Sequence, residues 1–159
     1  MYLNALEFLE EERDAFRAYE VLDELTDVQL DVEVAAAHGW SARDLMGHLV
    51  HWQDWALRMA RDLAVNETSN AAAELDAAWT AQGDALNDDA VAAWRALPLD
   101  EVRRRFRTIP GELRGYLTVV PESRWVKRSD TLRTFYEETT EHYADHQPEL
   151  AAILAAAGR

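Results

Sequence analysis

Two histidines, His142 and His146, lie four residues apart near the carboxyl end of the sequence, in the segment HYADH. If this segment is α-helical, the two imidazoles lie about 40° apart around the helix axis and about 6 Å apart along it. A pair at that spacing can chelate one metal ion. The pair alone is weak support for a metal site, because such pairs also occur on helices for structural reasons.

His48 supplies a third nitrogen donor. It belongs to a predicted amphipathic helix, residues 42–63, whose apolar side chains recur at helical spacing. With about 100° between successive residues, His48 falls inside this apolar stripe, whereas His51 falls on its flank. His38 precedes the helix in an expected loop. We therefore expect His48 to point toward the core, and we exclude His51 and His38 as its partners.

His48, His142 and His146 together form a predicted site for one divalent metal ion. Without a metal, three buried neutral imidazoles would leave ring nitrogens unpaired, at about 1–3 kcal/mol for each. Three nitrogen ligands suit Zn²⁺, Ni²⁺ or Fe²⁺, and a coordination position left to water is typical of catalytic zinc sites. The sequence contains no cysteine. This excludes thiolate ligands, disulfides and a cysteine nucleophile, and it fits a reducing compartment.

Long helices are expected to hold these histidines. Only four prolines and six glycines interrupt the sequence, and no run of β-branched residues has the length of a strand. We predict an all-α fold, an antiparallel four-helix bundle with the metal site in its core, formed by residues 1–159 as one domain. The predicted helices are about Leu3–Leu25, Ala42–Leu63, Leu99–Val120 and Ser129 onward. Pro148 either kinks the fourth helix or divides it from a short tail helix that ends at Gly158.

Local signals define some parts of these helices better than others. Ser41 and Asp44 form a predicted capping box at the start of the second helix. Pro110 followed by Gly111 predicts a kink or a break in the third. The organisation of residues 64–96 is hard to predict, because this segment is rich in alanine and polar residues. The residues expected to face the core include Leu6, Leu9, Phe16 and Leu22 from the first helix and Tyr116 from the third.

The acidic composition limits the partners of the protein. A formal net charge of −14 argues against nucleic-acid binding, which needs a basic face. The first residues alternate apolar and acidic side chains, unlike a signal peptide or a membrane span. We therefore expect a cytoplasmic protein with a small-molecule substrate and with no nucleic-acid or membrane partner. One basic cluster is expected to be a solvated helix face, with a docking surface for an anionic ligand as the alternative: Arg103, Arg104, Arg105 and Arg107.

Several of these residues together resemble a known family. The segment Trp40–Leu45, the GHL sequence around His48, Trp52 and the later HxxxH pair resemble the DinB-like superfamily. That group includes the amino-terminal domains of mycothiol-dependent maleylpyruvate isomerases and the bacillithiol S-transferases. The resemblance covers nearly the whole chain in helix order. It implies a four-helix bundle, often a homodimer, that binds a divalent metal through His48, His142 and His146.

The resemblance also implies a class of reaction. Characterised members are enzymes that activate a low-molecular-weight thiol at the metal, for transfer or isomerisation, while many others have no known reaction. A metal ion lowers the pKa of a bound thiol and makes it nucleophilic at neutral pH. Because this sequence has no cysteine, the thiol must arrive as a cosubstrate. No sequence feature marks a pocket for mycothiol or bacillithiol, and no catalytic residue is predicted.

Three functions compete on the sequence alone. The first is a metal-dependent enzyme, either a thiol S-transferase or a hydrolase that activates water. The second is a non-catalytic stress or interaction protein in which the metal is structural. The third, a di-iron bundle, needs Glu-x-x-His motifs on two helices. It is disfavoured, because the positions three residues before the three histidines are Leu45, Thr139 and Tyr143.

Residues around the metal can be suggested from sequence order. Tyr143 and Trp52 are expected to be core or pocket-wall residues. Arg13 is expected to pair with a neighbouring glutamate, with an inward anchor for a substrate carboxylate as the alternative. Metal-bound histidines usually donate their second N–H to a carboxylate or a carbonyl. The acidic candidates for this role are Glu12, Asp44, Glu138 and Asp145.

Overall fold

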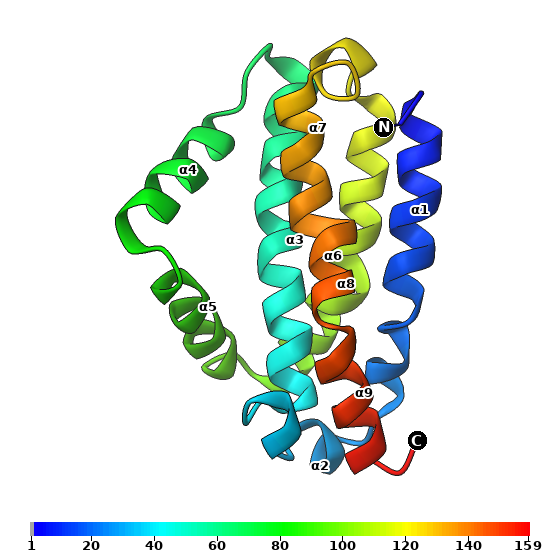
Figure 1. Cartoon of the computed structure of the whole chain (residues 1–159), viewed down its shortest axis with the longest axis vertical. Helices are drawn as coiled ribbons and strands as arrows, with labels where there is room; N and C mark the ends of the chain where they lie inside the picture. The colour runs from blue at the N-terminus through cyan, green and yellow to red at the C-terminus, as the bar shows by residue number, and fades with distance from the viewer. Residues whose placement is uncertain (1) are drawn as a thin grey trace.

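The computed structural model describes residues 2–159, which form helices and no β-strand (Figure 1). Met1 lies outside the described residues. The predicted all-α class is confirmed. Within this range, none of the helices combines the length and the apolar character of a membrane span. The longer helices are α1 (Ala5–Arg17), α3 (Ala42–Val65), α4 (Asn70–Gln82), α5 (Ala85–Arg95), α6 (Leu99–Val119), α7 (Ser129–Tyr136) and α9 (Gln147–Ala156). The shorter elements are η1 (Glu20–Glu24), α2 (Asp27–Leu30), η2 (Ala35–Ala37), η3 (Glu122–Arg124), the π-helical turn η4 (Glu137–Glu141) and α8 (His142–Asp145).

The long helices lie side by side and run in two opposite directions. In Figure 1, α1 and the successive helices α7 to α9 run downward, whereas α3 and α6 run upward. α3 packs against α6, η4 and α9. α3 and α6 are therefore parallel neighbours within a bundle whose other two members run the opposite way, an order of helices that the connection lengths in the sequence do not fix. The reason for the parallel order is the connection between them, because α4 and α5 return the chain along the outside of α3.

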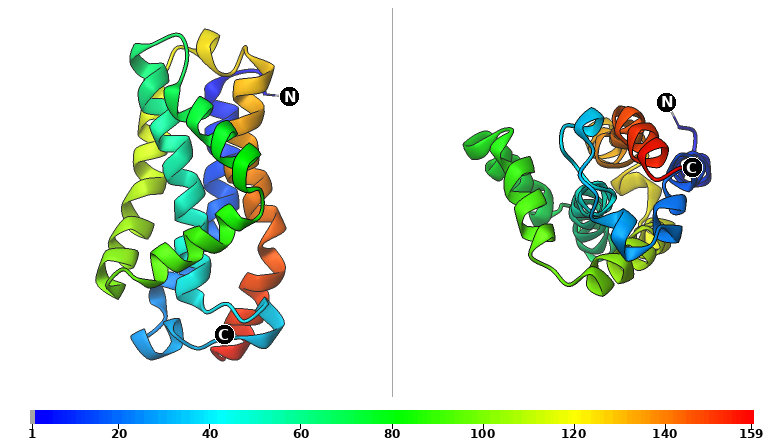
Figure 2. Two further views of the ribbon diagram at one scale, coloured as in Figure 1. Left: turned by 90° about the vertical axis from the view of Figure 1, so that its left-hand side faces the viewer. Right: turned by 90° about the horizontal axis from the view of Figure 1, so that it is seen from below.

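α4 and α5 occupy the segment that the sequence left unassigned. They lie outside α3 and away from α1 (Figure 2). α5 approaches α3 closely where Gly47 faces Trp94, and a Cβ at Gly47 would lie only 2.7 Å from the Trp94 Cβ. The amphipathic pattern of α4 and α5 is hard to recognise in the sequence, because each helix buries only a narrow face. The buried residues of these faces are Ala71, Leu75, Ala90, Val91 and Trp94.

The first helix differs from the prediction in length and in its buried face. α1 ends at Arg17, and the 3₁₀ turn η1 follows it. Phe16 and Leu22 are buried as predicted, but Leu6 is 63% exposed and Leu9 is only partly buried. The spacing of apolar residues could not identify the buried face of α1, because the middle residue of that face, Glu12, is charged. The buried residues of α1 are Phe8, Glu12 and Phe16.

The two prolines near the expected breaks act differently. α6 is continuous from Leu99 to Val119 with Pro110 inside it, so the helix is not broken there. Pro148 lies in the first turn of α9, where a missing N–H does not disturb the helix because that group has no helical partner. α8 ends at Asp145 and α9 begins at Gln147, so of the two alternatives left open by the sequence the structure has the separate tail helix.

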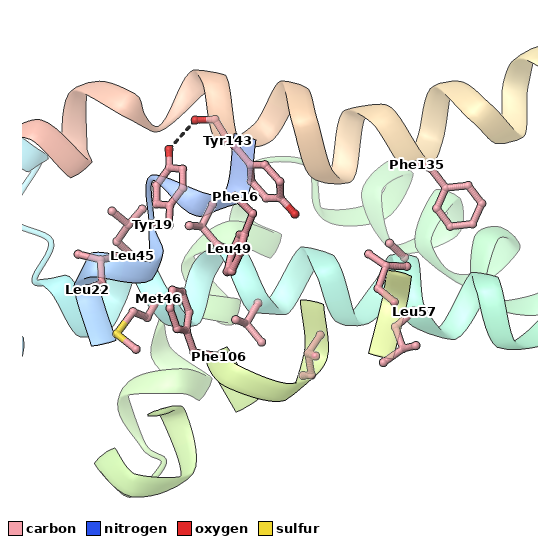
Figure 3. Packing of buried hydrophobic residues seen from close by; sticks show 14 of the residues in the cluster. Phe16, Tyr19, Leu22, Leu45, Met46, Leu49, Leu57, Phe106, Phe135 and Tyr143 are labelled. Atoms are coloured by element: carbon pink, nitrogen blue, oxygen red, sulfur yellow. Dashed lines mark hydrogen bonds between the residues drawn. The ribbon is translucent and has the colours of Figure 1, made fainter. Parts of the chain in front are cut away.

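A continuous hydrophobic core lies between α1, α3, α6 and the α7–α9 segment (Figure 3). The Phe16 ring lies 5.3 Å from that of Phe106 and 5.5 Å from that of Tyr143, measured between centroids. The Tyr19 hydroxyl donates a hydrogen bond to the main-chain carbonyl of Tyr143. Tyr116, which was expected in this core, is 37% exposed. Side chains from helices far apart in the sequence therefore surround Tyr143, the residue that follows His142.

The basic cluster on α6 forms ion pairs within the chain. Arg104 and Arg105 both donate to Glu101, as expected for a solvated helix face. Arg103 is more buried, with 15% of its side chain exposed, and also donates to the carbonyls of Asp23 and Leu25. The cluster therefore joins α6 to the segment before α2. The ion pairs are Arg103–Asp23, Arg103–Asp27, Arg104–Glu101, Arg105–Glu101 and Arg107–Asp23.

Candidate metal centre

Three histidines from two distant parts of the sequence meet between α3 and the α8–α9 segment. His48 lies in α3, His142 is the first residue of α8, and His146 lies between α8 and α9. One ring nitrogen of each lies within 4.8 Å of those of the other two, and the Nε2 atoms of His48 and His142 are 2.9 Å apart. The ring centroids are 4.7–4.8 Å apart. This histidine cluster could hold one metal ion.

The first turn of α3 sets the position of His48. The Ser41 hydroxyl accepts a hydrogen bond from the Asp44 N–H, and the Asp44 carboxylate accepts one from the Ser41 N–H, so the predicted capping box is confirmed. Asp44 also accepts two bonds of 2.7 Å from the Arg95 guanidinium at the end of α5. Burial raises the pKa of Asp44, but the bonds from Arg95 and Ser41 outweigh it and hold the pKa below its ordinary value. α3 is therefore fixed one turn before His48.

A π-helical turn, η4, directly precedes the other two histidines. Within it, the Thr139 hydroxyl donates a 2.6 Å bond to the Phe135 carbonyl. A π turn contains one residue more than an α turn would at that place, and such turns are frequent at functional sites. Residues before η4 are thereby rotated relative to His142. A single helical period along the fourth predicted helix therefore cannot describe both of its halves.

Burial favours the neutral form of all three imidazoles. Burial lowers the pKa of His48 to about 2, with further contributions from His142 and His146. Burial also lowers the pKa of His142 to about 3, with His146 adding to the effect. The pKa of His146 is lowered by burial, although the carboxylate of Glu149 acts in the opposite direction. Neutral imidazole is the form that donates a lone pair to a metal.

The hydrogen bonds within the histidine cluster are incomplete. Within residues 2–159, the buried Nδ1 atoms of His48 and His146 have no hydrogen-bond partner. The Nδ1 atom of His146 lies 3.5 Å from Glu149 Oε2, but without the geometry of a hydrogen bond. Buried polar atoms without partners cost about 1–3 kcal/mol each. Three converging neutral nitrogens with unmet capacity fit a divalent ion of the zinc, nickel or iron type.

Indole rings enclose the histidine cluster. The centroid of Trp40 lies 4.8 Å from that of His48 and 5.5 Å from that of His146. Trp40 is held by an isolated antiparallel bridge to Val34, in which the Val34 N–H donates to the Trp40 carbonyl at 3.1 Å. On another side, the Trp52 ring lies 6.0 Å from that of His142. These rings limit the access of water to the site.

The other two histidines lie apart from the cluster. His51 accepts a 3.3 Å bond from the Trp55 indole N–H, and it is not among the residues whose nitrogens converge. His38 lies in the loop before α3, in a left-handed conformation with φ of 58°. Its Nε2 lies 3.4 Å from Glu149 Oε1. The structure therefore agrees with the helical-angle argument, which placed His48 toward the core and His51 on the flank of the helix.

The acidic residues proposed from the sequence have other roles. Within the described residues, no hydrogen bond joins any of the four candidates to a histidine of the cluster. Asp44 caps α3, Glu12 bonds to Tyr143, and Asp145 is exposed. Glu149, which the sequence analysis missed, is the carboxylate nearest to a cluster nitrogen. Its spacing of three residues after His146 is the signal that could have identified it.

A second polar cluster, the Tyr143 network, lies in the core beside the first. It contains Glu12 from α1, Gln53 from α3, Arg114 from α6 and Tyr143 from α8. The Tyr143 hydroxyl accepts a 2.6 Å bond from the Gln53 amide and donates a 2.9 Å bond to Glu12. Glu12 also accepts a 2.9 Å bond from Arg114. The network thus fixes Tyr143, and with it the backbone between His142 and His146.

The charges of this network were not apparent from the sequence. Burial raises the pKa of Glu12, whereas the Arg114 guanidinium and the Tyr143 hydroxyl act to lower it. Arg114 is therefore the inward arginine, with 21% of its side chain exposed. Arg13 is exposed, so it is not the inward anchor considered as the alternative, and among the described residues it does not form the expected ion pair with a neighbouring glutamate. Tyr143 was predicted to be a core residue, and its side chain is buried as expected.

A cavity of about 440 Å³ lies next to the histidine cluster, between α3, α4 and the α7–η4 segment. We call it the α4 cavity. Its walls include His142, the indoles of Trp52 and Trp79, and a carboxyl group from Glu138. Burial and the nearby carboxylate of Glu137 raise the pKa of Glu138 to about 8. Trp52 was predicted to be a core or pocket-wall residue, and it is both buried and part of this wall.

Comparison with known proteins assigns the family. The model of the mycothiol maleylpyruvate isomerase N-terminal domain family matches residues 9–156, nearly the whole chain. No curated protein and no solved structure matches the chain. The histidine cluster and the helix order agree with the resemblance drawn from Trp40, His48 and the HxxxH pair. The chain therefore belongs to the mycothiol maleylpyruvate isomerase N-terminal domain family, a DinB-like family.

Proposed function

We propose that this protein is a metal-dependent enzyme that activates a low-molecular-weight thiol for transfer or isomerisation. One divalent ion, Zn²⁺, Ni²⁺ or Fe²⁺, is held by His48, His142 and His146. α1, α3, α6 and the α7–α9 segment form the DinB-like four-helix bundle around it, and α4 and α5 form an outer arm. The observation that carries the proposal is the convergence of three neutral ring nitrogens within 4.8 Å.

The donor set supports a catalytic rather than a structural metal. In the described part of the chain, no carboxylate or further histidine joins the three nitrogens in one ligand group. Structural zinc sites usually have four protein ligands, whereas catalytic sites have three. The metal would supply Lewis acidity, which lowers the pKa of a thiol that it contacts. The chain has no cysteine, so the thiol is a cosubstrate, and the family is named for a mycothiol enzyme.

The residues around the site have separate tasks in this proposal. Trp40 and Trp52 exclude water from two sides of the histidine cluster. Tyr143 and the capping box of α3 hold the two histidine-bearing segments in place. The α4 cavity, which reaches His142, is the space for the organic part of a substrate. Its volume of about 440 Å³ lies within the usual range for small-molecule sites.

The proposal is tested with protein loaded with Zn²⁺, Ni²⁺ or Fe²⁺ and incubated with a panel of low-molecular-weight thiols and one electrophile. Adducts are followed by mass spectrometry. We expect at least one thiol to form an adduct faster with loaded wild-type protein than with the metal-free protein or with loaded His142→Ala. If no thiol is consumed above the uncatalysed rate with any of the metals, thiol activation is refuted, and a hydrolase that activates water or the non-catalytic alternative is favoured.

A further inference from the structure

The carboxylate of Glu149 lies beside the histidine cluster, and the proposed function gives it no task. Its Oε2 atom is 3.5 Å from the Nδ1 atom of His146. Both atoms are buried, and within residues 2–159 neither has a hydrogen-bond partner. An imidazole nitrogen that carries a proton is a donor, and a carboxylate oxygen is an acceptor. Two buried polar atoms without partners therefore lie next to each other and can satisfy one another.

The surroundings of this pair favour a strong hydrogen bond. Only 17% of the His146 side chain and 13% of the Glu149 side chain is exposed. A hydrogen bond to a charged group is stronger in such a shielded place than in water. The separation of 3.5 Å exceeds the usual N–H···O distance by roughly half an ångström. A small rotation of either side chain is therefore enough to form the bond.

Capping of α9 does not account for the place of Glu149. His146 directly precedes α9, and Glu149 follows three residues later, a position from which a glutamate often bonds back to the main-chain N–H before a helix. Here the His146 N–H already donates to the His142 carbonyl at 3.3 Å. In the described part of the chain, no side chain makes a capping bond at this helix start. The Glu149 carboxylate lies beside the His146 ring instead.

The other oxygen of Glu149 faces the loop before α3. Glu149 Oε1 lies 3.4 Å from the Nε2 atom of His38, whose side chain is 81% exposed. Exposed pairs of this kind contribute little to stability. The carboxylate thus lies between one exposed and one buried imidazole, and only the buried one, His146, belongs to the histidine cluster. The contact with His146 is therefore the one expected to matter.

We propose that Glu149 is a positioning residue whose carboxylate accepts the Nδ1 proton of His146 and so leaves the Nε2 lone pair of this ring for the metal. A neutral imidazole carries one proton, so a partner that holds this proton on Nδ1 fixes the tautomer and the orientation of the ring. The negative charge also makes the imidazole a stronger ligand. This role rests on the metal binding of the proposed function, but not on activation of a thiol.

Zinc affinity, measured by competition with a chelator, tests the role of Glu149 toward the metal. Carboxylates that orient a metal-bound histidine contribute about 10–100-fold to metal affinity, and we expect Glu149→Ala to weaken zinc binding about 30-fold. Glu149→Gln keeps an acceptor but loses the charge, so it should weaken zinc binding by only about fivefold. Equal zinc affinity in wild type and Glu149→Ala would overturn the proposal and leave the metal site standing.

Matched variants separate this role from a merely structural one. Asp145→Asn removes an exposed carboxylate next to His146 and should leave the zinc affinity unchanged. His38→Ala removes the other partner of Glu149 and should also leave it unchanged. Urea denaturation of metal-free Glu149→Gln should match that of wild type. A clear loss of stability in this variant, or an effect of His38→Ala on zinc affinity as large as that of Glu149→Ala, would overturn the proposal.

Nuclear magnetic resonance of protein with isotope-labelled histidine reads the tautomer directly and needs no activity. In zinc-loaded wild type we expect a protonated Nδ1 and a zinc-bound Nε2 at His146, and zinc on Nδ1 would overturn the proposal. If wild type binds no zinc, the proposed function fails, and the metal-free protein still decides the orientation. A proton on Nδ1 of His146 that loses this preference in Glu149→Ala supports the proposal, whereas a proton on Nε2 in wild type would overturn it.

Discussion

His142 and Tyr143 are neighbours in the sequence, but they belong to two polar clusters of opposite kind. In the Tyr143 network, four helices contribute one side chain each, and charge faces charge between Glu12 and Arg114. Only the Gln53 carbonyl oxygen lacks a partner in the described residues. In the histidine cluster, three imidazoles converge. The Nε2 atoms of His48 and His142 lie 2.9 Å apart, and at most one of them carries a proton.

The difference indicates what each cluster is for. A buried polar network whose members bond to one another fixes the packing of helices and needs no further component. A buried cluster of like donors with unmet hydrogen-bonding capacity is unfavourable unless a ligand completes it. Loss of a member should therefore destabilise the fold in the Tyr143 network and change ligand binding in the histidine cluster.

The largest effect is expected for Arg114→Met. Removing the guanidinium leaves the buried Glu12 carboxylate without its counter-charge, which should lower the free energy of unfolding by about 3 kcal/mol. Urea denaturation of the metal-free protein measures it. Adding Glu12→Gln to this variant should recover part of the loss, since no buried charge then stands alone. A loss below about 1 kcal/mol would show that the network does not stabilise the fold.

Binding of a metal ion should raise the free energy of unfolding by slightly less than Arg114→Met lowers it. At a free metal concentration of about 100 times Kd, binding to the folded state alone adds about 2.7 kcal/mol to the free energy of unfolding. Urea denaturation with and without Zn²⁺ should show this gain in wild type and in Arg114→Met. The gain should be absent in His142→Ala. A zinc-dependent gain of equal size in His142→Ala would refute the division between the two clusters.

A smaller effect on the free energy of unfolding, and one that depends on pH, is expected at Asp44. Like the residues of the Tyr143 network, Asp44 is a buried polar residue that bonds to other residues of the chain. Because its pKa is held below the ordinary value of 3.8, its contribution to stability is present above that pH and is lost as the pH falls through the folded-state pKa. Asp44→Asn should therefore cost about 2 kcal/mol at pH 7.

The difference between wild type and Asp44→Asn should shrink below about pH 4. Urea denaturation at several pH values checks the trend. A difference that stays constant down to pH 3 would mean that neither Arg95 nor Ser41 stabilises the carboxylate form.

Much of the helix that bears His48 could be predicted from the sequence, because its determinants are local. The Ser41–Asp44 capping box needs only residues three apart, and the separation of His48 from His51 needs only the helical angle. These local rules do not use the rest of the fold. Naming the three histidines as one site needed more than local rules, because His48 lies far from His142 and His146 in the sequence: the expected helix bundle and the family resemblance brought them together.

The parts that sequence analysis missed depend on distant partners. Glu12 occupies an inward position on α1 because Arg114 and Tyr143 bond to it, and neither is near it in the sequence. The parallel order of α3 and α6 depends on the path of α4 and α5, whose narrow buried face gives a weak pattern. The π turn η4 changes the register before His142 without a sequence signal.

The central claim is that His48, His142 and His146 hold one divalent ion, and elemental analysis of purified protein tests it most directly. Wild type and His51→Ala should each contain about one metal ion per chain, since His51 bonds to Trp55 and lies outside the cluster. His142→Ala should contain almost none while remaining folded. Equal metal content in wild type and His142→Ala, or loss of metal in His51→Ala, would contradict this account.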